Sequence, residues 1–392
     1  MSAAIDRETW DDNSDNDIER QRRRKRNRRR EDESSERPVK KKRKRRPEEE
    51  PPKTRKEKRE AAQADIRKAP ADLRDYEREQ WETLNDFEEK AWSDMNKGLT
   101  VGWKGIDHAI GGLQTGFHVI GGDSNIGKTS FISQMAWNVA TLNQDAYVID
   151  ISLDDPMLEK VSRIIAAGKR VLINAVKTPR KFKQFPKMLE RRKAGLEQLR
   201  QMVDCYKTYD SDHSSDVEVI KETVKRHILE LKEAGEKRKV AVFIDNFHDL
   251  TTEAREAQGS DKAKYTYLAS FISDMATELD IAIVCSCEFK KINGFRRPSI
   301  DDLREAVKIK YEAKSVMLCY NEVSLKGEAA SVYFEKAGDA QKQPVYEVHF
   351  AKNKFSKFKG RVFFEGYPEM AYFIESDEAS SKRYNNVIYS NE

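Results

Sequence analysis

The chain has 392 residues, of which 38% are hydrophobic and 36% charged, and its formal net charge is +5. No apolar run approaches the ~18 residues of a membrane-spanning helix, and the N-terminus has no apolar signal-peptide core. These features argue against a membrane protein and predict a soluble intracellular one. The cysteines lack the spacing of a metal site and are predicted to be reduced structural thiols: Cys205, Cys285, Cys287 and Cys319.

The positive charge is concentrated near the N-terminus. Residues 21–60 hold 21 Lys or Arg and 9 Asp or Glu, a net charge of +12. Residues 1–70 have almost no large apolar side chain after Trp10 and cannot bury enough surface to offset their ordering entropy. We predict a disordered arm over 1–70 that binds DNA, RNA or a partner protein. A nuclear import signal at 38–47 and a solubilising tail are the alternatives.

An amphipathic helix is predicted over 71–97. Its apolar residues recur at helical spacing and no Gly or Pro interrupts the stripe before residue 98. Such a stripe must be buried on the chain's own core or on a neighbouring subunit. Its members are Leu73, Tyr76, Leu84, Phe87, Ala91 and Met95.

The stretch from Gly122 to Thr129 fits the phosphate-binding pattern G-x-x-x-x-G-K-[ST] at every fixed position. A β-prone stretch precedes it and a segment of helical period follows, so its backbone N–H groups can wrap a polyphosphate. Lys128 would reach the β- and γ-phosphates of ATP, and the Thr129 hydroxyl would hold Mg²⁺. The predicted nucleotide-binding residues are Gly122, Asp123, Ser124, Asn125, Ile126, Gly127, Lys128, Thr129 and Ser130.

Strands and helices alternate after this loop. The apolar strand 239–245 ends in Asp245 and has the form of a Walker B strand, whose carboxylate holds Mg²⁺ through water. A very basic helical region, 157–202, is interrupted near Pro179 and Pro186. The alternation, followed by a run of strands, predicts an α/β fold with a mostly parallel sheet and an antiparallel C-terminal edge. The other predicted strands are 145–153, 203–210, 281–287, 315–320, 345–351, 361–365 and 371–374, with helices at 217–234 and 265–279.

In order and spacing, these motifs resemble the ATPase domain of hexameric replicative helicases of the DnaB type, bacterial and phage. The resemblance implies a RecA-like P-loop NTPase domain over 98–377, followed by a flexible tail over 378–392. The basic arm takes the place of the family's N-terminal domain, and 71–97 corresponds to a linker helix that packs on the next subunit. ATP and Mg²⁺, single-stranded DNA, a homo-hexamer, and primase or other replisome proteins are the implied cofactors and partners. The stretches that carry the resemblance are 98–107, 111–113, 122–129, 152–154, 242–245, 297–298, 302–305 and 350–354.

The resemblance also assigns roles to single residues. Asp154 stands where the family has a glutamate that activates the attacking water. Lys352 and Lys354 stand for a Lys and Arg pair that reaches into the neighbouring subunit's site. Cys287 replaces a polar glutamine, and Val307 a glycine of the channel loop. The implied DNA contacts are Lys290, Lys291, Arg296, Arg297, Arg304, Glu305, Lys308 and Lys310.

The leading interpretation is an ATP-dependent helicase or translocase on single-stranded DNA in replication. A RecA- or RadA-like recombination or repair ATPase is a second interpretation. A third is a weakened helicase that serves as an ATP-gated DNA-binding or loading factor. The run from Arg297 to Glu305 favours the first, and the departures at Asp154, Cys287, Val307 and Lys354 favour the third.

Overall fold

The computed structural model describes residues 81–85, 87–89, 97–292, 294–304, 306–336, 338 and 341–391. The chain divides into two compact units, Met1–Thr83 and Leu84–Glu392. The predicted arm and most of the predicted helix at 71–97 lie outside the described residues, although 81–85 and 87–89 are helical. The rest of this description concerns the second unit.

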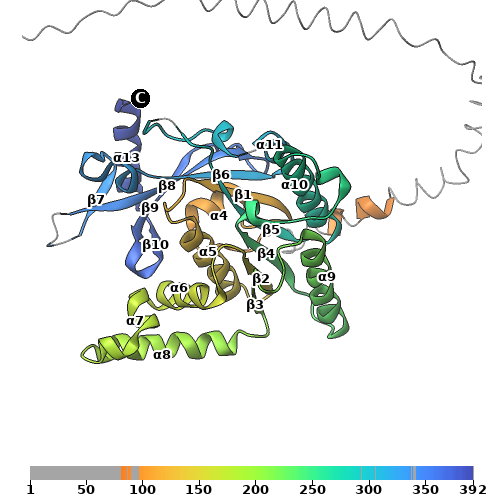
Figure 1. The fold of residues 1–392 in the computed structure, drawn as a ribbon, viewed down its shortest axis with the longest axis horizontal. Helices are drawn as coiled ribbons and strands as arrows, with labels where there is room; N and C mark the ends of the chain where they lie inside the picture. The colour runs from red at the N-terminus through yellow and green to blue at the C-terminus, as the bar shows by residue number, and fades with distance from the viewer. Residues whose placement is uncertain are drawn as a thin grey trace, which may run out of the picture. The chain divides into compact units, whose positions relative to one another are not determined.

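A ten-stranded mixed sheet forms the centre of this unit (Figure 1). Its strand order is β10-β9-β8-β6-β1-β5-β4-β2-β3, and β7 pairs with β8. All pairs from β6 to β3 in this order are parallel, whereas β8 joins β6, β7 and β9 antiparallel, as β9 joins β10. The predicted fold class is confirmed. The strands are β1 Gly116–Gly122, β2 Ala146–Ser152, β3 Tyr206–Asp210, β4 Lys239–Asp245, β5 Ala282–Glu288, β6 Ser315–Asn321, β7 Tyr333–Glu335, β8 Lys342–Asn353, β9 Arg361–Tyr367 and β10 Tyr372–Glu375.

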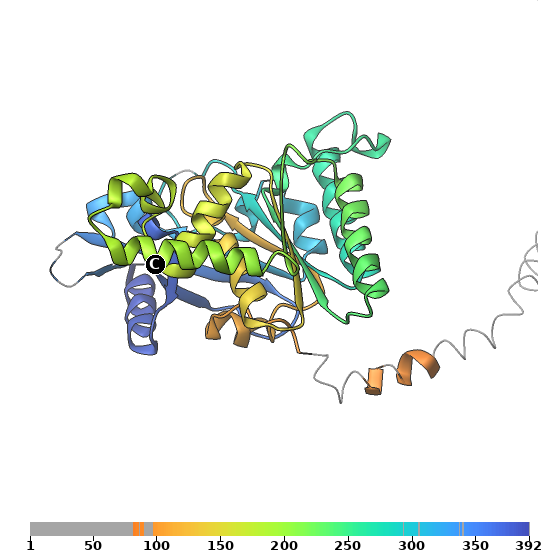
Figure 2. The ribbon, with the colours of Figure 1, turned by 90° about the horizontal axis from the view of Figure 1, so that it is seen from below.

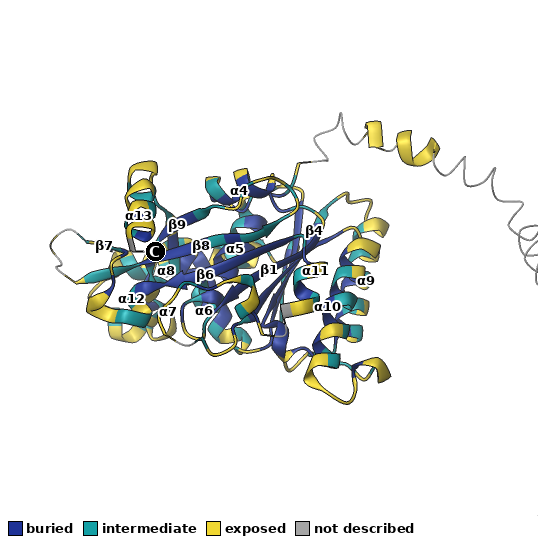
Figure 3. Ribbon diagram, turned by 90° about the horizontal axis from the view of Figure 1, so that it is seen from above, coloured by how far each residue is buried: buried dark blue, intermediate teal, exposed yellow. Residues whose placement is uncertain are grey.

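Helices cover both faces of the parallel strands β1, β2, β4 and β6, which are apolar almost throughout and appear buried in Figure 3. The edge strand β3 is only half-buried. The apolar core is divided into two layers, one on each face of the sheet. Neighbouring residues of β1 contribute to different layers, because successive side chains of a strand point to opposite faces. Ile120 joins the apolar layer beneath α5, and Val119 joins the layer beneath α9 and α10. The helices are α4 Lys104–Ile110, α5 Lys128–Leu142, α6 Met157–Lys169, α7 Ile173–Lys177, α8 Pro186–Gln201, α9 Val217–Glu233, α10 Asp261–Glu278, α11 Ala306–Glu312, α12 Glu322–Lys326 and α13 Glu378–Asn391.

The basic region between β2 and β3 folds as α6, α7 and α8, with a 3₁₀ turn at Pro179–Phe182. Both prolines mark the predicted interruptions, because Pro179 opens the 3₁₀ turn and Pro186 opens α8. The strand predicted from 203 begins only at Tyr206. Residues 203–205 instead form a turn after α8, in which the backbone N–H groups of Cys205 and Tyr206 donate to the Met202 carbonyl.

The C-terminal segment differs from its prediction as a flexible tail. Residues Glu378–Asn391 form α13, whose Tyr384 and Ile388 are 2% and 0% exposed. They pack with Phe363 of β9 and with Phe334 and Val345, which belong to β7 and β8. The prediction of a flexible tail was wrong because the few apolar residues of 378–392 gave only a weak signal. Their helical spacing brings them to one side of α13, where they pack.

Among the described residues, no helix is long and apolar enough to cross a membrane. The same residues contain no group of three or more His, Cys, Asp or Glu side chains arranged to hold a metal ion. The four cysteines are free thiols, and burial raises the pKa of Cys319 to about 12. Cys285, Cys287 and Cys319 are buried in strands β5 and β6, whereas Cys205 is half-buried just before β3.

Candidate functional site

The phosphate-binding loop connects the central strand β1 to the N-terminus of α5. Gly127 has a φ of 106°, which L side chains rarely adopt, and Asn125 has a φ of 61°. A Cβ on Gly122 would lie 2.7 Å from the Ile126 Cδ1 and 3.0 Å from the Lys128 Cγ. The two glycines of the pattern are therefore favoured for different reasons. Gly127 has a backbone conformation that suits glycine, whereas a side chain at Gly122 would press on those of Ile126 and Lys128.

Lys128 is the first residue of α5 and is only 8% exposed. Its Nζ donates to the Asp123 carbonyl at 2.7 Å, so the ammonium lies over the loop itself. The first turn of α5 contains no acidic side chain that would compete for its N–H groups. A phosphate in this loop would meet a fixed cation together with the positive end of a helix dipole.

Asp245 ends β4 beside the loop, and its side chain is 2% exposed. One carboxylate oxygen, Oδ1, accepts from the Ser286 hydroxyl of β5, whereas Oδ2 is buried with no hydrogen-bond partner in the described part of the chain. Thr129, in the first turn of α5, supplies a half-buried hydroxyl. Hard oxygen ligands and an unpartnered carboxylate oxygen fit Mg²⁺, which prefers few protein ligands and retains waters.

Asp154 follows β2 closely, and the backbone connects it to the Walker B strand. The N–H groups of Leu153 and Asp154 donate to the Asp245 carbonyl at 2.5 and 3.4 Å. Burial, followed by the charges of Asp155, Asp245 and Glu288, raises the pKa of Asp154, and Lys128 opposes this shift. A carboxylate with a raised pKa is a better proton acceptor in turnover.

Asp155, the alternative one residue later, has a different partner. Its Oδ2 accepts from the Arg163 Nη1 at 2.5 Å, which directs this carboxylate toward α6. Asp154 is exposed and lies within electrostatic reach of Lys128. The local geometry therefore favours Asp154 over Asp155 as the carboxylate that faces the phosphate-binding loop.

Two further carboxylates belong to this site, and the sequence analysis missed both. Glu288 ends β5 directly opposite Gly122 in the strand register. Burial, with the charges of Asp154, Glu288 and Asp245, raises the pKa of Asp249 in the 3₁₀ turn after β4. The signal for Glu288 was present, because the last residue of a parallel strand lies at the edge where ligands bind in open α/β sheets.

Lys352 and Lys354 lie at the end of β8, at the opposite edge of the sheet from the chain's own loop. Lys352 pairs in register with Val316, near the start of β6, and β6 is parallel to β1. The Lys352 Nζ donates to the carbonyls of Lys310 and, at 3.0 Å, Tyr311, near the C-terminal end of α11. Burial, and then the charge of Lys354, lowers the pKa of Lys352 to about 8.

The predicted DNA contacts lie in the loop after β5, which leaves the carboxyl edge of the sheet, and on α11, whose C-terminal end lies beside Lys352 at the opposite edge. Lys291 and Arg304 are exposed, whereas the Lys290 Nζ donates to the Asp301 carbonyl at 3.4 Å. Three others already have carboxylate partners. These ion pairs are Arg296 with Asp302, Lys308 with Glu312, and Lys310 with Asp301. Glu305 lies outside the described residues.

Arg297 has a different environment from the other members of this set. Its Nε and Nη2 donate to Glu347 at 2.9 and 2.6 Å, and Nη2 lies 3.5 Å from Glu322. The guanidinium also lies over the Tyr320 ring, 5.1 Å from its centroid. Its side chain is 16% exposed, so a DNA contact would require this ion pair to open.

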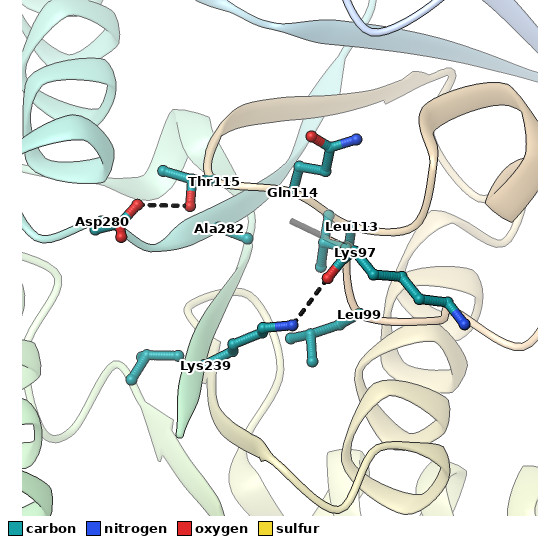
Figure 4. A pocket seen from close by; sticks show the side chains of 10 residues that line it. Lys97, Leu99, Leu113, Gln114, Thr115, Lys239, Asp280 and Ala282 are labelled. Atoms are coloured by element: carbon teal, nitrogen blue, oxygen red, sulfur yellow. Dashed lines mark hydrogen bonds between the residues drawn. The ribbon is translucent and has the colours of Figure 1, made fainter. Parts of the chain in front are cut away.

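A pocket of about 320 Å³ lies elsewhere, where β1, β4 and β5 begin (Figure 4). Lys239 donates to the Lys97 carbonyl at 2.9 Å along its wall, and Thr115 donates to Asp280 at 2.9 Å. None of the predicted site residues lines it. The candidate nucleotide site lies at the opposite edge, at the loop and the strand ends.

Comparison with known proteins agrees with the fold. Residues 98–362 match the family model of the DnaB-like helicase C terminal domain. A solved structure described as an ATPase domain superimposes with a TM-score of 0.63 at 19% identity, covering 76% of this chain and 98% of that chain. A DnaB-like replicative helicase, described with its interactions with primase, gives 0.62 at 20% identity, covering 75% of this chain and 66% of that one. No curated protein matches the sequence.

Proposed function

The chain belongs to the family of DnaB-like helicase C-terminal domains, and we propose that it is an ATP-driven helicase or translocase acting on single-stranded DNA in replication. One observation supports this most directly. Lys128, Asp154 and Asp245 come from three separate segments and converge at one edge of the sheet. A phosphate cradle, a buried metal-binding carboxylate and an exposed carboxylate of raised pKa together suit hydrolysis of a nucleoside triphosphate.

Each residue has a separate role in this proposal. The loop from Gly122 to Thr129 binds the polyphosphate through backbone N–H groups, and Lys128 neutralises the β- and γ-phosphates. Asp154 orients the attacking water and accepts its proton. Thr129 and Asp245 would hold Mg²⁺, which would neutralise charge developing on the phosphates. Lys291 and Arg304 would bind the phosphates of the DNA strand.

The direct test is ATP turnover with and without an oligothymidine strand, paired with a mass measurement by light scattering with and without ATP. Turnover stimulated by the strand, together with assembly beyond a monomer, is the expected result. Nucleotide-dependent DNA binding without stimulated turnover would favour the loading factor. Pairing of homologous strands by the chain would favour the recombination ATPase.

The position of Lys352 and Lys354 supports a ring, proposed here to be a homo-hexamer. Because both lie at the sheet edge opposite the chain's own loop, they can approach a γ-phosphate only in another subunit. We expect Lys352→Ala/Lys354→Ala and Lys128→Ala each to be inactive alone. Mixed together, they should recover part of the turnover, because intact loops then face intact lysines. Mixtures that form joint rings and stay inactive would exclude action of Lys352 and Lys354 on the neighbouring subunit's site.

Arg304 tests the DNA loop. Arg304→Ala should lose most DNA stimulation of turnover at saturating DNA, because an exposed cation leaves the strand-binding edge while the nucleotide site stays intact. Basal turnover is the internal control, and Lys232→Ala on the exposed side of α9 is the matched variant. Equal stimulation in the two variants would remove Arg304 from the DNA site.

Deleting the 1–70 arm should instead weaken the affinity of the chain for DNA and flatten the salt dependence of that affinity.

A further inference from the structure

A cationic surface on the α7–α8 region has no role in the ATPase site. Residues 177–193 contain eight Lys or Arg and one Glu, a net charge of +7. Lys177 pairs with Glu159, and the Arg192 Nε donates to the Val176 carbonyl at 2.9 Å. The other six cations are exposed, and we call them, together with Phe185, the α8 patch: Arg180, Lys181, Lys183, Lys187, Arg191 and Lys193.

An aromatic side chain lies among these charges. Phe185 is 48% exposed, and its ring centroid lies 6.3 Å from that of Phe182. It lines a pocket of about 440 Å³ together with Pro186, Lys187, Met188 and Arg191. An exposed aromatic ring beside cations suits a ligand with both a flat apolar face and negative charge.

The patch lies apart from the proposed DNA loops. α6 contacts β10, and α6 and α7 contact the turn Pro368–Met370, at one end of the sheet, whereas α11 lies on the other side of the molecule in Figure 1. In Figures 1 and 2, α8 lies on the outer side of α6, away from the sheet. Only Gly195 of α8 is buried, so the helix presents most of its surface outward.

We propose that the α8 patch is a second binding site for single-stranded nucleic acid, separate from the loop after β5 and from α11. Sequence-tolerant single-strand sites combine a cationic track for the backbone with aromatic rings on which bases stack. Lys187 and Arg191 are four residues apart on α8, about 6 Å along its axis, and so form such a track on one side of the helix. Phe185 supplies the ring. An acidic peptide would use the cations and leave the ring without a stacking partner.

The test uses the full chain and an oligothymidine strand carrying one photoreactive iodouracil base. Ultraviolet cross-linking followed by mass spectrometry should place the base on a peptide that contains Phe185. Phe185→Ala should lower this cross-link yield about fivefold or more, the smaller end of the effect of one base–aromatic stack. The variant Lys183→Glu/Lys187→Glu should lose the cross-link and reduce the log–log salt slope of binding by about 0.7 for each phosphate contact removed.

The matched control is Lys232→Glu/Lys237→Glu, which makes the same charge change at exposed positions near the end of α9. It should keep both the cross-link and the slope. Basal ATP turnover should be unchanged in both variants, which separates this proposal from the ATPase assignment. No cross-link at the patch, or equal losses in patch and control variants, would overturn the proposal. Competition by polyglutamate but not by oligothymidine would also overturn it and indicate an acidic protein partner.

Discussion

Asp154→Asn should lower ATP turnover by about two to four orders of magnitude, the range for a removed general base, while nucleotide binding persists. The amide keeps the size of the side chain but cannot accept a proton from the attacking water. Since burial and three carboxylates raise the pKa of Asp154, wild-type turnover should fall as the pH drops through this raised value. Single-turnover hydrolysis and binding of a fluorescent ATP analogue measure the two effects separately.

Two further variants serve as comparisons for Asp154→Asn. Lys128→Ala should lose nucleotide binding as well as turnover, because it removes the cation fixed over the loop. Asp155→Asn should retain most of the activity, since Asp155 is paired with Arg163 and directed toward α6. A severe loss in Asp155→Asn with a mild one in Asp154→Asn would show that the catalytic carboxylate had been assigned one residue too early.

The parallel core was predictable because both faces of its strands are covered, which leaves continuous apolar runs in the sequence. The run ending in Asp245 became β4 with the predicted bounds, and the β-prone stretch before the loop became β1. The loop itself was predictable because its glycines have local causes: the backbone conformation at Gly127 and the nearby side chains of Ile126 and Lys128 at Gly122. Local chemistry fixed both features, so a single sequence was sufficient.

Features that depend on contacts between distant segments were not predictable in the same way. Glu288 belongs to the candidate nucleotide site only through the register that sets it opposite Gly122. The packing of α13 depends on Phe334, Val345 and Phe363, which lie on three strands. Exposed and buried cations also look alike in sequence. Arg296 and Arg297 are adjacent, yet their side chains are 53% and 16% exposed.

Arg297→Met should lower the free energy of unfolding by about 3 to 5 kcal/mol, because it leaves the buried carboxylate of Glu347 without its main partner. The nearby Arg361, whose Nε lies 3.9 Å from Glu347, is too distant to replace two direct hydrogen bonds. Arg296→Met is the matched control. Its ion pair with Asp302 is half exposed, and such pairs contribute only about 0 to 1 kcal/mol. Urea unfolding of the two variants compares a buried cation with an exposed one.

The pH dependence of Arg297→Met provides an independent check. Burial already raises the pKa of Glu347, and Arg297 lowers it, so removal of Arg297 should raise that pKa further. A folded-state pKa above the unfolded value means that the folded chain binds more protons, so stability falls as the pH rises. The deficit of Arg297→Met should therefore shrink as the pH falls, and Glu347→Gln in the same chain should restore part of the stability at neutral pH. If Arg297→Met instead unfolds like Arg296→Met but binds single-stranded DNA more weakly, Arg297 acts on DNA and its ion pair opens in the complex.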